Sequence, residues 1–132
     1  LKFKAPENVT VAYHDPCCLG RMMGEYEAPR DLIQLVDGAT MVELENNKER
    51  ALCCGVSSMM YCNDATKAVR RKRLDQGTDA GIDLMLGGCP KCYMHMQCML
   101  NEERMNPEDG HHHDYEMMDL MQFLVACLEG EN

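Results

Sequence analysis

The segment IDLMLGGCPKC, residues 82–92, decides the fold that this sequence predicts. Its mostly apolar stretch at 82–86 is typical of a buried β-strand, and Gly87 and Gly88 mark the end of that strand. The next residues, CPKC at 89–92, lead into a predicted helix at 90–103, whose first turn tolerates the proline. A strand, a short cysteine-bearing loop and a helix therefore follow one another directly.

The same succession of strand and helix signals extends in both directions from this segment. Further strands are predicted at 9–13 and 40–44, helices at 29–36, 63–76 and 115–128, and a polar loop at 106–114. We expect the last helix to present one apolar face, formed by Met118, Met121, Leu124, Val125 and Leu128. The alternation predicts a single α/β domain over residues 1–132, with a mainly parallel sheet flanked by helices.

The composition argues against several classes of protein. The chain has 132 residues, enough for one core, and a formal net charge of −9. This charge argues against a nucleic-acid partner, because phosphate binding needs a basic surface. No apolar run is long enough to cross a membrane. The first residues, LKFKAPENVT, lack Met and a signal-peptide pattern, which predicts a fragment or one half of a larger subunit, cytoplasmic or peripheral to a membrane complex.

Cysteine is the unusual residue type in this chain. There are nine cysteines, an odd number, and no secretion signal accompanies them. Secreted disulfide scaffolds are usually smaller and even in cysteine. A reduced set of metal ligands is therefore the better interpretation.

Five cysteines occupy positions from which they can bind one metal group. Cys17 follows the first predicted strand, Cys53 and Cys54 follow an apolar run, and Cys89 and Cys92 follow the strand quoted above. Loops beyond the carboxyl ends of parallel strands converge on one crevice, so ligands far apart in sequence can meet there. Five thiolates exceed the four ligands of zinc, and adjacent cysteines can bind different irons of one cluster. The set therefore favours an iron–sulfur cluster.

Residues around these thiols suit the same chemistry. Cys89 and Cys92 lie at a predicted helix N-terminus, which stabilises thiolates. Gly55 lets the backbone approach a cluster and donate an N–H to sulfide. His14 is a candidate proton donor to a leaving thiolate, or a hydrogen-bond donor to the cluster, with turn capping as the alternative. Cys62 is a further candidate for the cluster pocket, with core packing as the alternative.

Several other polar and sulfur-containing residues have more ordinary interpretations. Cys18 is an alternative ligand or a packed side chain, and we expect Cys98 and Cys127 to be core thiols. The basic run at 67–73 predicts a solvated helix face, with attraction of an anionic thiol or an acidic partner as the alternative. The three histidines at 111–113 predict a mobile polar loop.

These motifs resemble the cysteine-rich CCG domain that is found in the B and D subunits of heterodisulfide reductase. The resemblance rests on four stretches of sequence: YHDPCCLGR at 13–21, YEAPRDLI at 26–33, ERALCCG at 49–55 and CPKC at 89–92. It extends over residues 10–128. The chain departs from the family pattern in having one CCG motif where relatives commonly have two, Cys18 where many have His, and Val-Ser-Ser rather than glycines after Gly55.

The resemblance implies an oxidoreductase function within a multi-subunit complex of anaerobic metabolism. In heterodisulfide reductase each CCG motif holds a non-cubane [4Fe–4S] assembly, and here the implied ligands are Cys17, Cys53, Cys54, Cys89 and Cys92. Other CCG motifs of the family hold zinc or lack a full ligand set. The cluster would receive electrons from iron–sulfur or flavin subunits and cleave a small disulfide substrate. The alternatives are an electron-transfer module for a quinone- or dehydrogenase-linked complex, without bond cleavage here, and a structural zinc-binding domain.

Overall fold

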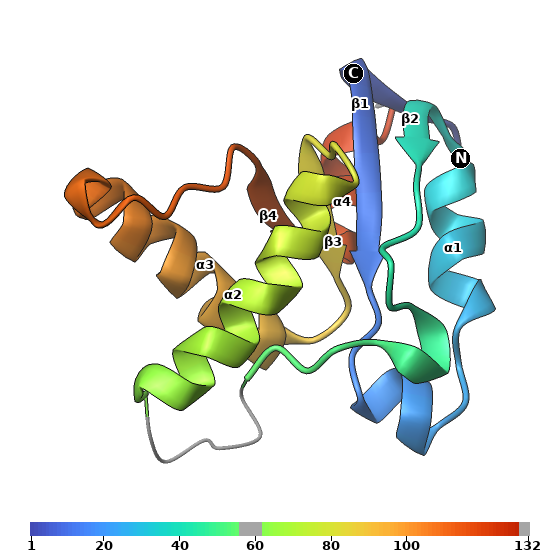
Figure 1. The fold of residues 1–132 in the computed structure, drawn as a ribbon. Coiled ribbons are helices and arrows are strands. Elements are labelled where there is room, and N and C mark those ends of the chain that lie inside the picture. Colours follow the sequence, from blue (N-terminus) through green and yellow to red (C-terminus); the bar gives the residue numbers. More distant parts are fainter. Residues whose placement is uncertain (56–61, 130–132) are drawn as a thin grey trace.

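A parallel β-sheet forms the centre of the molecule (Figure 1). The structure is a computed structural model that describes residues 1–55 and 62–129. Its four strands are β1 (Phe3–His14), β2 (Val36–Met41), β3 (Leu84–Gly87) and β4 (Glu116–Asp119), in the order β2-β1-β3-β4. All three neighbouring pairs are parallel, which confirms the predicted α/β class.

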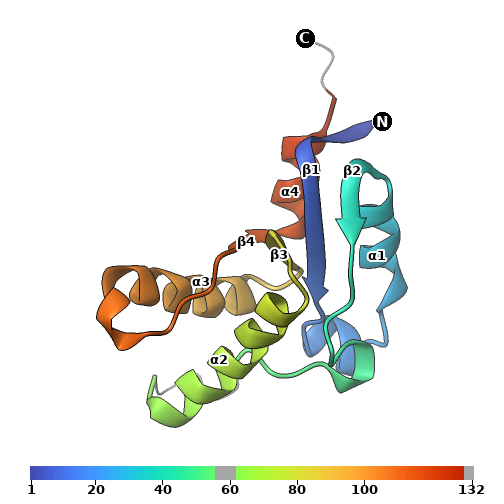
Figure 2. The same ribbon diagram turned by 45° about the horizontal axis from the view of Figure 1, so that its top comes forward.

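Helices cover both faces of this sheet. They are α1 (Glu27–Gln34), α2 (Asp64–Asp79), α3 (Pro90–Met105) and α4 (Leu120–Cys127). Figure 2 shows α2 and α3 together on one side of the strands, away from α1. Among the described residues, no helix combines the length and the apolarity that a membrane-spanning segment needs.

The strands divide the core into two apolar clusters. Ala12 and Met85 belong to the cluster with α2 and α3, whereas Val11, Tyr13 and Leu86 belong to the cluster with α1 and α4. Successive strand residues point to opposite faces, so alternate residues of β1 and β3 serve different clusters. This is why β3 and the last part of β1, Val11–Tyr13, read as continuous apolar runs in the sequence.

The strand order places a switch point between β1 and β3. From β1 the chain moves outward to β2, and it then returns to the other side of β1 to add β3 and β4. In such doubly wound sheets the loops beyond the carboxyl ends of the two central strands separate and leave a crevice. The residues that follow β1 and β3 therefore border this crevice.

Two predicted elements are wrong in position. The second strand is Val36–Met41 rather than 40–44, and a fourth strand, Glu116–Asp119, occupies the start of the helix predicted at 115–128. Met117 and Met118 belong to opposite clusters, so the period of this stretch is two and not 3.6. The Asp119 side chain then caps α4 by accepting bonds from the N–H groups of Met121 (2.8 Å) and Gln122 (3.3 Å).

The apolar face predicted for the last helix is also wrong. Met121 and Val125 are exposed, and Leu124 is buried. The helix buries a different stripe, formed by Leu120, Phe123, Leu124 and Cys127. The strand at 116–119 shifts the start of the helix, and with it the face that meets the sheet.

Helix α2 confirms its predicted cap but continues beyond its predicted end. Asn63 and Thr66 form a capping box, in which each side chain bonds to the other residue's backbone N–H. Gly77 lies inside the helix because Tyr115 packs against it. A Cβ at this glycine would lie 2.7 Å from the Tyr115 hydroxyl, which donates a 2.6 Å bond to the Leu74 carbonyl.

The structure corrects two further expectations about polar residues. The basic run at 67–73 is not a uniformly solvated face, because Arg70 and Arg73 are fully buried. In the histidine loop, His113 is buried, with Nδ1 2.7 Å from Glu103 Oε2 and Nε2 2.7 Å from Asp75 Oδ1. These contacts anchor the end of the loop that the sequence predicted to be mobile.

Candidate metal centre

The five candidate ligands lie around the crevice at the carboxyl ends of β1 and β3. Cys17 comes three residues after β1, and Cys89 is the N-cap of α3, just after β3. Cys92 lies in the first turn of α3. Cys53 and Cys54 lie on the segment that runs from the short turn at Lys48–Arg50 towards α2. The topology thus brings together segments that the sequence separates by more than 30 residues.

A cavity of about 210 Å³ opens between these segments. It is lined by Cys17, Cys53, Cys54 and Cys92, together with His14, Asp15, Pro16, Arg21, Lys48, Ala51 and Leu52. The space is several times the roughly 30 Å³ that a water molecule occupies in the liquid. A group larger than a single ion can therefore enter among the thiols.

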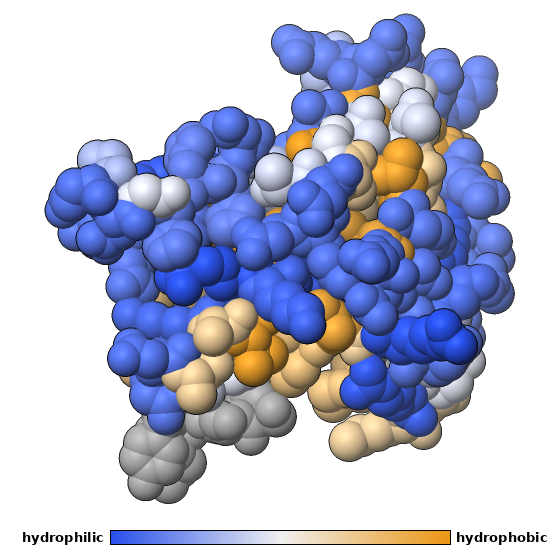
Figure 3. Space-filling model, in the orientation of Figure 1, coloured by the Kyte–Doolittle hydropathy of each residue, from blue (hydrophilic) through white to orange (hydrophobic). Residues whose placement is uncertain are grey.

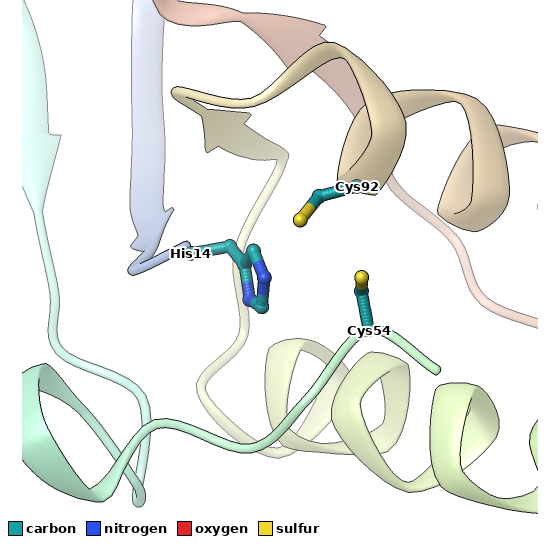
Figure 4. A group of neighbouring side chains, drawn as sticks. All are labelled: His14, Cys54 and Cys92. Atoms are coloured by element: carbon teal, nitrogen blue, oxygen red, sulfur yellow. The ribbon is translucent and has the colours of Figure 1, made fainter. Parts of the chain in front are cut away.

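The buried thiols contact one another at the floor of the cavity. Figure 4 shows Cys54 and Cys92 with their sulfur atoms facing each other beside the ring of His14. One nitrogen of His14 and the two sulfur atoms all lie within 4.8 Å of one another. The hydrogen bond with Cys54 and burial together raise the pKa of Cys92 well above its ordinary value, and Cys89 also bonds to this thiol. Cys89 is thereby joined to the group that lines the cavity.

Cys17 and Cys53 form the more accessible side of the same group. Cys17 is exposed and Cys53 is partly buried. Burial, the hydrogen bond with Cys18 and the nearby Cys53 and Cys54 raise the pKa of Cys17. An external molecule would therefore meet these two sulfurs before it reached Cys54 or Cys92.

Gly55 lies where the backbone passes close to helix α2. Its φ of +86° is in the left-handed region, and a Cβ here would lie 2.8 Å from the Thr66 carbonyl oxygen. Its N–H donates to the sulfur of Cys53 at 3.3 Å. The glycine therefore sets the path of the chain after the cysteine pair and places a donor on one candidate ligand.

His14 is held from behind by an arginine. Arg73 Nε donates a 2.9 Å bond to His14 Nδ1, and Arg73 Nη1 donates to the Asn46 carbonyl and to Gln76 Oε1. Burial lowers the pKa of His14, against the opposing effect of a hydrogen bond with Cys54, so the ring is neutral at pH 7. Since Nδ1 accepts from Arg73, the neutral ring carries its proton on Nε2. His14 is thus fully hydrogen-bonded inside the site and does not cap a turn from the surface.

Asp15 holds the frame of the cavity together. Both of its oxygens accept bonds from Arg30, at 2.8 and 2.7 Å, and one also accepts from the Lys48 N–H at 2.8 Å. Burial raises the pKa of Asp15, but the bonds from Arg30 and from the Lys48 N–H outweigh it, and the pKa lies below its ordinary value. Asp15 therefore ties β1 to α1 and to the segment that leads to the cysteine pair.

The exposure of the four remaining cysteines agrees with the predictions only in part. Cys127 is buried, as expected, but Cys98 is exposed and is not a core thiol. Cys18 and Cys62 are exposed as well, and Cys62 is absent from the described residues that line the cavity. The segment 56–61, which includes the predicted Val-Ser-Ser departure, lies outside the described residues.

Sequence reasoning missed the arginines around the site. Arg70 and Arg73 are three residues apart on α2 and lie on its buried face with Thr66, Leu74 and Gly77. The only signal in the sequence is that these positions follow a helical stripe of small and apolar residues. A run of basic residues hides that stripe, because arginine and lysine usually mark a solvated face.

The donor set fits an iron–sulfur cluster better than a single hard cation. Thiolates are the ligands that iron–sulfur clusters take, and carboxylates, which hard cations prefer, are nearly absent from the described cavity lining. The one lining carboxylate among these residues, Asp15, is already engaged by Arg30. Four of the five cysteines line this cavity, and the fifth, Cys89, bonds to Cys92.

Comparisons with known proteins agree with this chemistry. Residues 11–97 match the family of CCG cysteine-rich domains. The chain is 33% identical over 94 residues to the D subunit of the dihydromethanophenazine:CoB–CoM heterodisulfide reductase of Methanosarcina barkeri, a match covering 70% of this chain and 23% of the relative. It is 30% identical over 94 residues to FadF of Bacillus subtilis, named a probable iron–sulfur-binding oxidoreductase, with 70% and 13% covered.

A third relative is named for electron transfer to a quinone. The chain is 31% identical over 101 residues to the EtfAB:quinone oxidoreductase of Syntrophomonas wolfei, a match covering 70% of this chain and 14% of the relative. The chain spans less than a quarter of the length of these three proteins. The family match takes in most of the chain and all five candidate ligands, and the chain therefore belongs to the CCG family of cysteine-rich domains.

Proposed function

We propose that this chain binds an iron–sulfur cluster through Cys17, Cys53, Cys54, Cys89 and Cys92 and transfers electrons as part of an oxidoreductase complex. The observation that carries the proposal is the single cavity lined by four of these cysteines, with the fifth bonded to Cys92. The names of the relatives support it, since all three are redox proteins.

When bound, such a cluster supplies one-electron redox chemistry. The residues of this chain hold and shield it. Cys54 and Cys92 would bind from the buried floor, and Cys17 and Cys53 from the accessible side. Arg73 holds the ring of His14 beside the two buried sulfurs. Gly55 donates its N–H to Cys53, and hydrogen bonds to cluster sulfurs tune the reduction potential.

We further propose that the complex reduces a small disulfide at the accessible side of this cavity. Arg21 lines the cavity together with exposed Cys17, and its guanidinium bonds to backbone carbonyls, so its positive charge faces an entering ligand. Lys48 also lines the cavity, but its ammonium pairs with Glu27. Positive charge favours an anionic thiol or disulfide. Electrons would come from an iron–sulfur or flavin subunit, and cleavage of the S–S bond by two electrons and two protons would yield two thiols.

A second candidate function is electron transfer without bond cleavage at this site. The specific observation in its favour is that a relative of similar identity is a quinone oxidoreductase. In this case the cluster of this chain would pass electrons on to another group and would not bind a sulfur substrate.

Anaerobic reconstitution tests the ligand assignment. We expect wild-type protein to take up iron and sulfide and to show the broad visible absorbance of an iron–sulfur cluster, and Cys54→Ala to lose both. Cys98→Ala is the matched control, because it removes an exposed thiol of α3 and should leave iron and sulfide unchanged. Circular dichroism confirms that each variant is folded. Full iron and sulfide in Cys54→Ala would contradict the assignment, and stoichiometric zinc without iron would establish the structural alternative.

The same loaded protein separates the two redox functions. Adding a small thiol should change the EPR spectrum if a substrate sulfur binds the cluster. An unchanged spectrum at saturating thiol would reject the disulfide substrate and leave the electron-transfer function.

A further inference from the structure

The buried face of α2 carries positive charge that the described residues do not neutralise. Arg70 and Arg73 are both 0% exposed. Within residues 1–55 and 62–129, Nε, Nη1 and Nη2 of Arg70 have no hydrogen-bond partner, and Nη2 of Arg73 has none either. Neither arginine makes an ion pair in this part of the chain. Four buried guanidinium nitrogens therefore lack an acceptor among the residues that the structure describes.

Such an arrangement is costly for a folded protein. A buried charge without a partner loses its hydration and gains nothing in return. Arginine does not escape this cost by losing its proton, because the guanidinium group stays charged in proteins at neutral pH. Buried groups of this kind in native proteins call for an explanation, such as an ion or a group that binds there.

Both arginines lie next to the candidate ligands. The Cβ position of Gly55, the residue after Cys54, is 3.6 Å from Arg70 Cβ. Arg73 is bonded to His14, which itself lies within 4.8 Å of the sulfurs of Cys54 and Cys92. The Arg70 charge also acts on His95 of α3, and so does Cys54, which places all three groups in one electrostatic neighbourhood. The unbalanced charge therefore lies behind the residues that line the cavity, on the helix that packs against Gly55 and His14.

A cluster held by thiolates supplies what these arginines lack. Each ligating cysteine contributes one negative charge, so four or five thiolates exceed the positive charge of the iron–sulfide core. No carboxylate among the described residues forms an ion pair with Arg70, although its charge acts on Glu102 as well as on His95, which also feels Cys54. Burying such an anionic group is itself unfavourable unless cations lie close to it.

We propose that Arg70, assisted by Arg73, is the built-in counter-charge of the metal centre and raises the reduction potential of the cluster. This inference rests on the proposed function, because it requires an anionic metal group at the five cysteines. Arg70 acts through its charge on the cluster and is a positioning residue, not a catalytic one. A buried cation stabilises the reduced form, which carries one more negative charge, over the oxidised form.

The test compares Arg70→Met with Lys72→Met on the same helix. Both remove one positive charge from α2, but Lys72 is exposed and Arg70 is buried. In loaded protein we expect the midpoint potential of Arg70→Met to become more negative, and that of Lys72→Met to stay at the wild-type value. Arg70→Lys retains the charge and should keep a potential close to that of the wild type.

A second readout compares Arg70→Met with the wild type in the cluster-free and in the loaded protein, where we expect the substitution to have opposite effects. Without the cluster, Arg70→Met removes an uncompensated buried charge, so we expect its melting temperature to equal or exceed that of the wild type. With the cluster, we expect Arg70→Met to bind iron and sulfide less tightly than the wild type. A merely structural arginine would lower the melting temperature in both states alike.

The outcomes separate this inference from the proposed function. A loaded Arg70→Met protein with the wild-type potential would overturn the inference alone. A wild-type protein that takes up no iron and sulfide would overturn both. If Arg70→Met fails to load, recovery of loading in Arg70→Lys supports the role of charge, and failure of Arg70→Lys to load refutes it.

Discussion

Two buried arginines of this protein, Arg30 and Arg70, have opposite surroundings. Arg30 is 4% exposed and makes five hydrogen bonds, to both oxygens of Asp15, both oxygens of Glu43 and the carbonyl of Tyr26. Arg70 is 0% exposed and has no partner for its guanidinium among the described residues. Burial alone therefore does not tell the role of a charged side chain.

The difference shows what each arginine needs from outside the chain. Arg30 and its carboxylates form a complete network, which joins β1, α1 and the segment after β2 without any ligand. Arg70 completes its interactions only when another negative group enters. The first region is a structural joint, and the second is part of a site.

The largest expected effect comes from breaking the complete network. Arg30→Met leaves the carboxylate of Asp15 buried without its partner, and removing one member of a buried pair costs about 3–5 kcal/mol. We expect this loss in urea unfolding at neutral pH, whether or not the cluster is bound. Arg50→Met, which removes an exposed arginine, is the control and should leave the unfolding midpoint nearly unchanged. If Arg30→Met were as stable as this control, the network would not be the joint described above.

An effect of intermediate size is expected in the pH dependence of stability, which tests the Asp15–Arg30 network from the side of its carboxylate. The pKa of Asp15 lies below its ordinary value in the folded protein, so the unfolded chain binds this proton more readily. The contribution of Asp15 to stability is therefore complete above about pH 5 and is lost as the pH falls below about 4, towards the folded pKa. We expect the unfolding free energy of the wild type to fall more steeply with acid than that of Asp15→Asn. Parallel curves for the two proteins would contradict this role of Asp15.

The smallest expected effect concerns a solvated cation of α2. Lys67 Nζ lies 2.8 Å from Glu102 Oε1, and both side chains are partly exposed. Exposed ion pairs of this kind contribute little, because water already solvates both charges. Lys67→Met should therefore leave the melting temperature and the iron content close to wild-type values, and the small difference should shrink further in high salt. A large loss of iron in this variant would show that charge anywhere on α2 matters, and would remove the distinction between its two faces.

Figure 3 illustrates why the sequence concealed this distinction. In that view the surface over α2 combines hydrophilic residues with an apolar patch over the lower part of the helix. The exposed Lys72 is adjacent in sequence to the buried Arg73, and the two belong to the same basic run. One basic segment of the sequence thus contributes to both the solvated face and the buried face of α2.

Other parts of the fold were predictable from local patterns. Asn63 and the proline at 90 predicted the starts of α2 and α3, and the structure has Asn63 as the N-cap of α2 and Pro90 as the first residue of α3. The stretch at 115–128 misled because its first four residues after Tyr115, Glu116–Asp119, form a strand at the sheet edge. Its methionines suit a helix as well as a strand, so only the pairing with β3 decides between them.

The candidate site was predictable for a related reason. Several cysteines placed just after strands predict metal ligation, because few structures gather so many thiols for packing alone. The positions of Cys17, Cys54 and Cys92 around one cavity follow from parallel strands that end at one edge. The role of His14, by contrast, could not be predicted from the sequence, because it depends on the hydrogen bond that Arg73 of α2 donates to its ring.

The sequence by itself determined the class of fold, the family and the set of thiols that can bind a metal group, since these depend on residue type and on order along the chain. Only the tertiary structure decided which charges are solvated and which are buried. Arg70, Arg73 and His113 all belong to stretches whose composition predicts exposure. They are buried because of the faces that α2 and the loop before β4 turn towards the rest of the protein, and burial depends on contacts between segments that no single stretch of sequence contains.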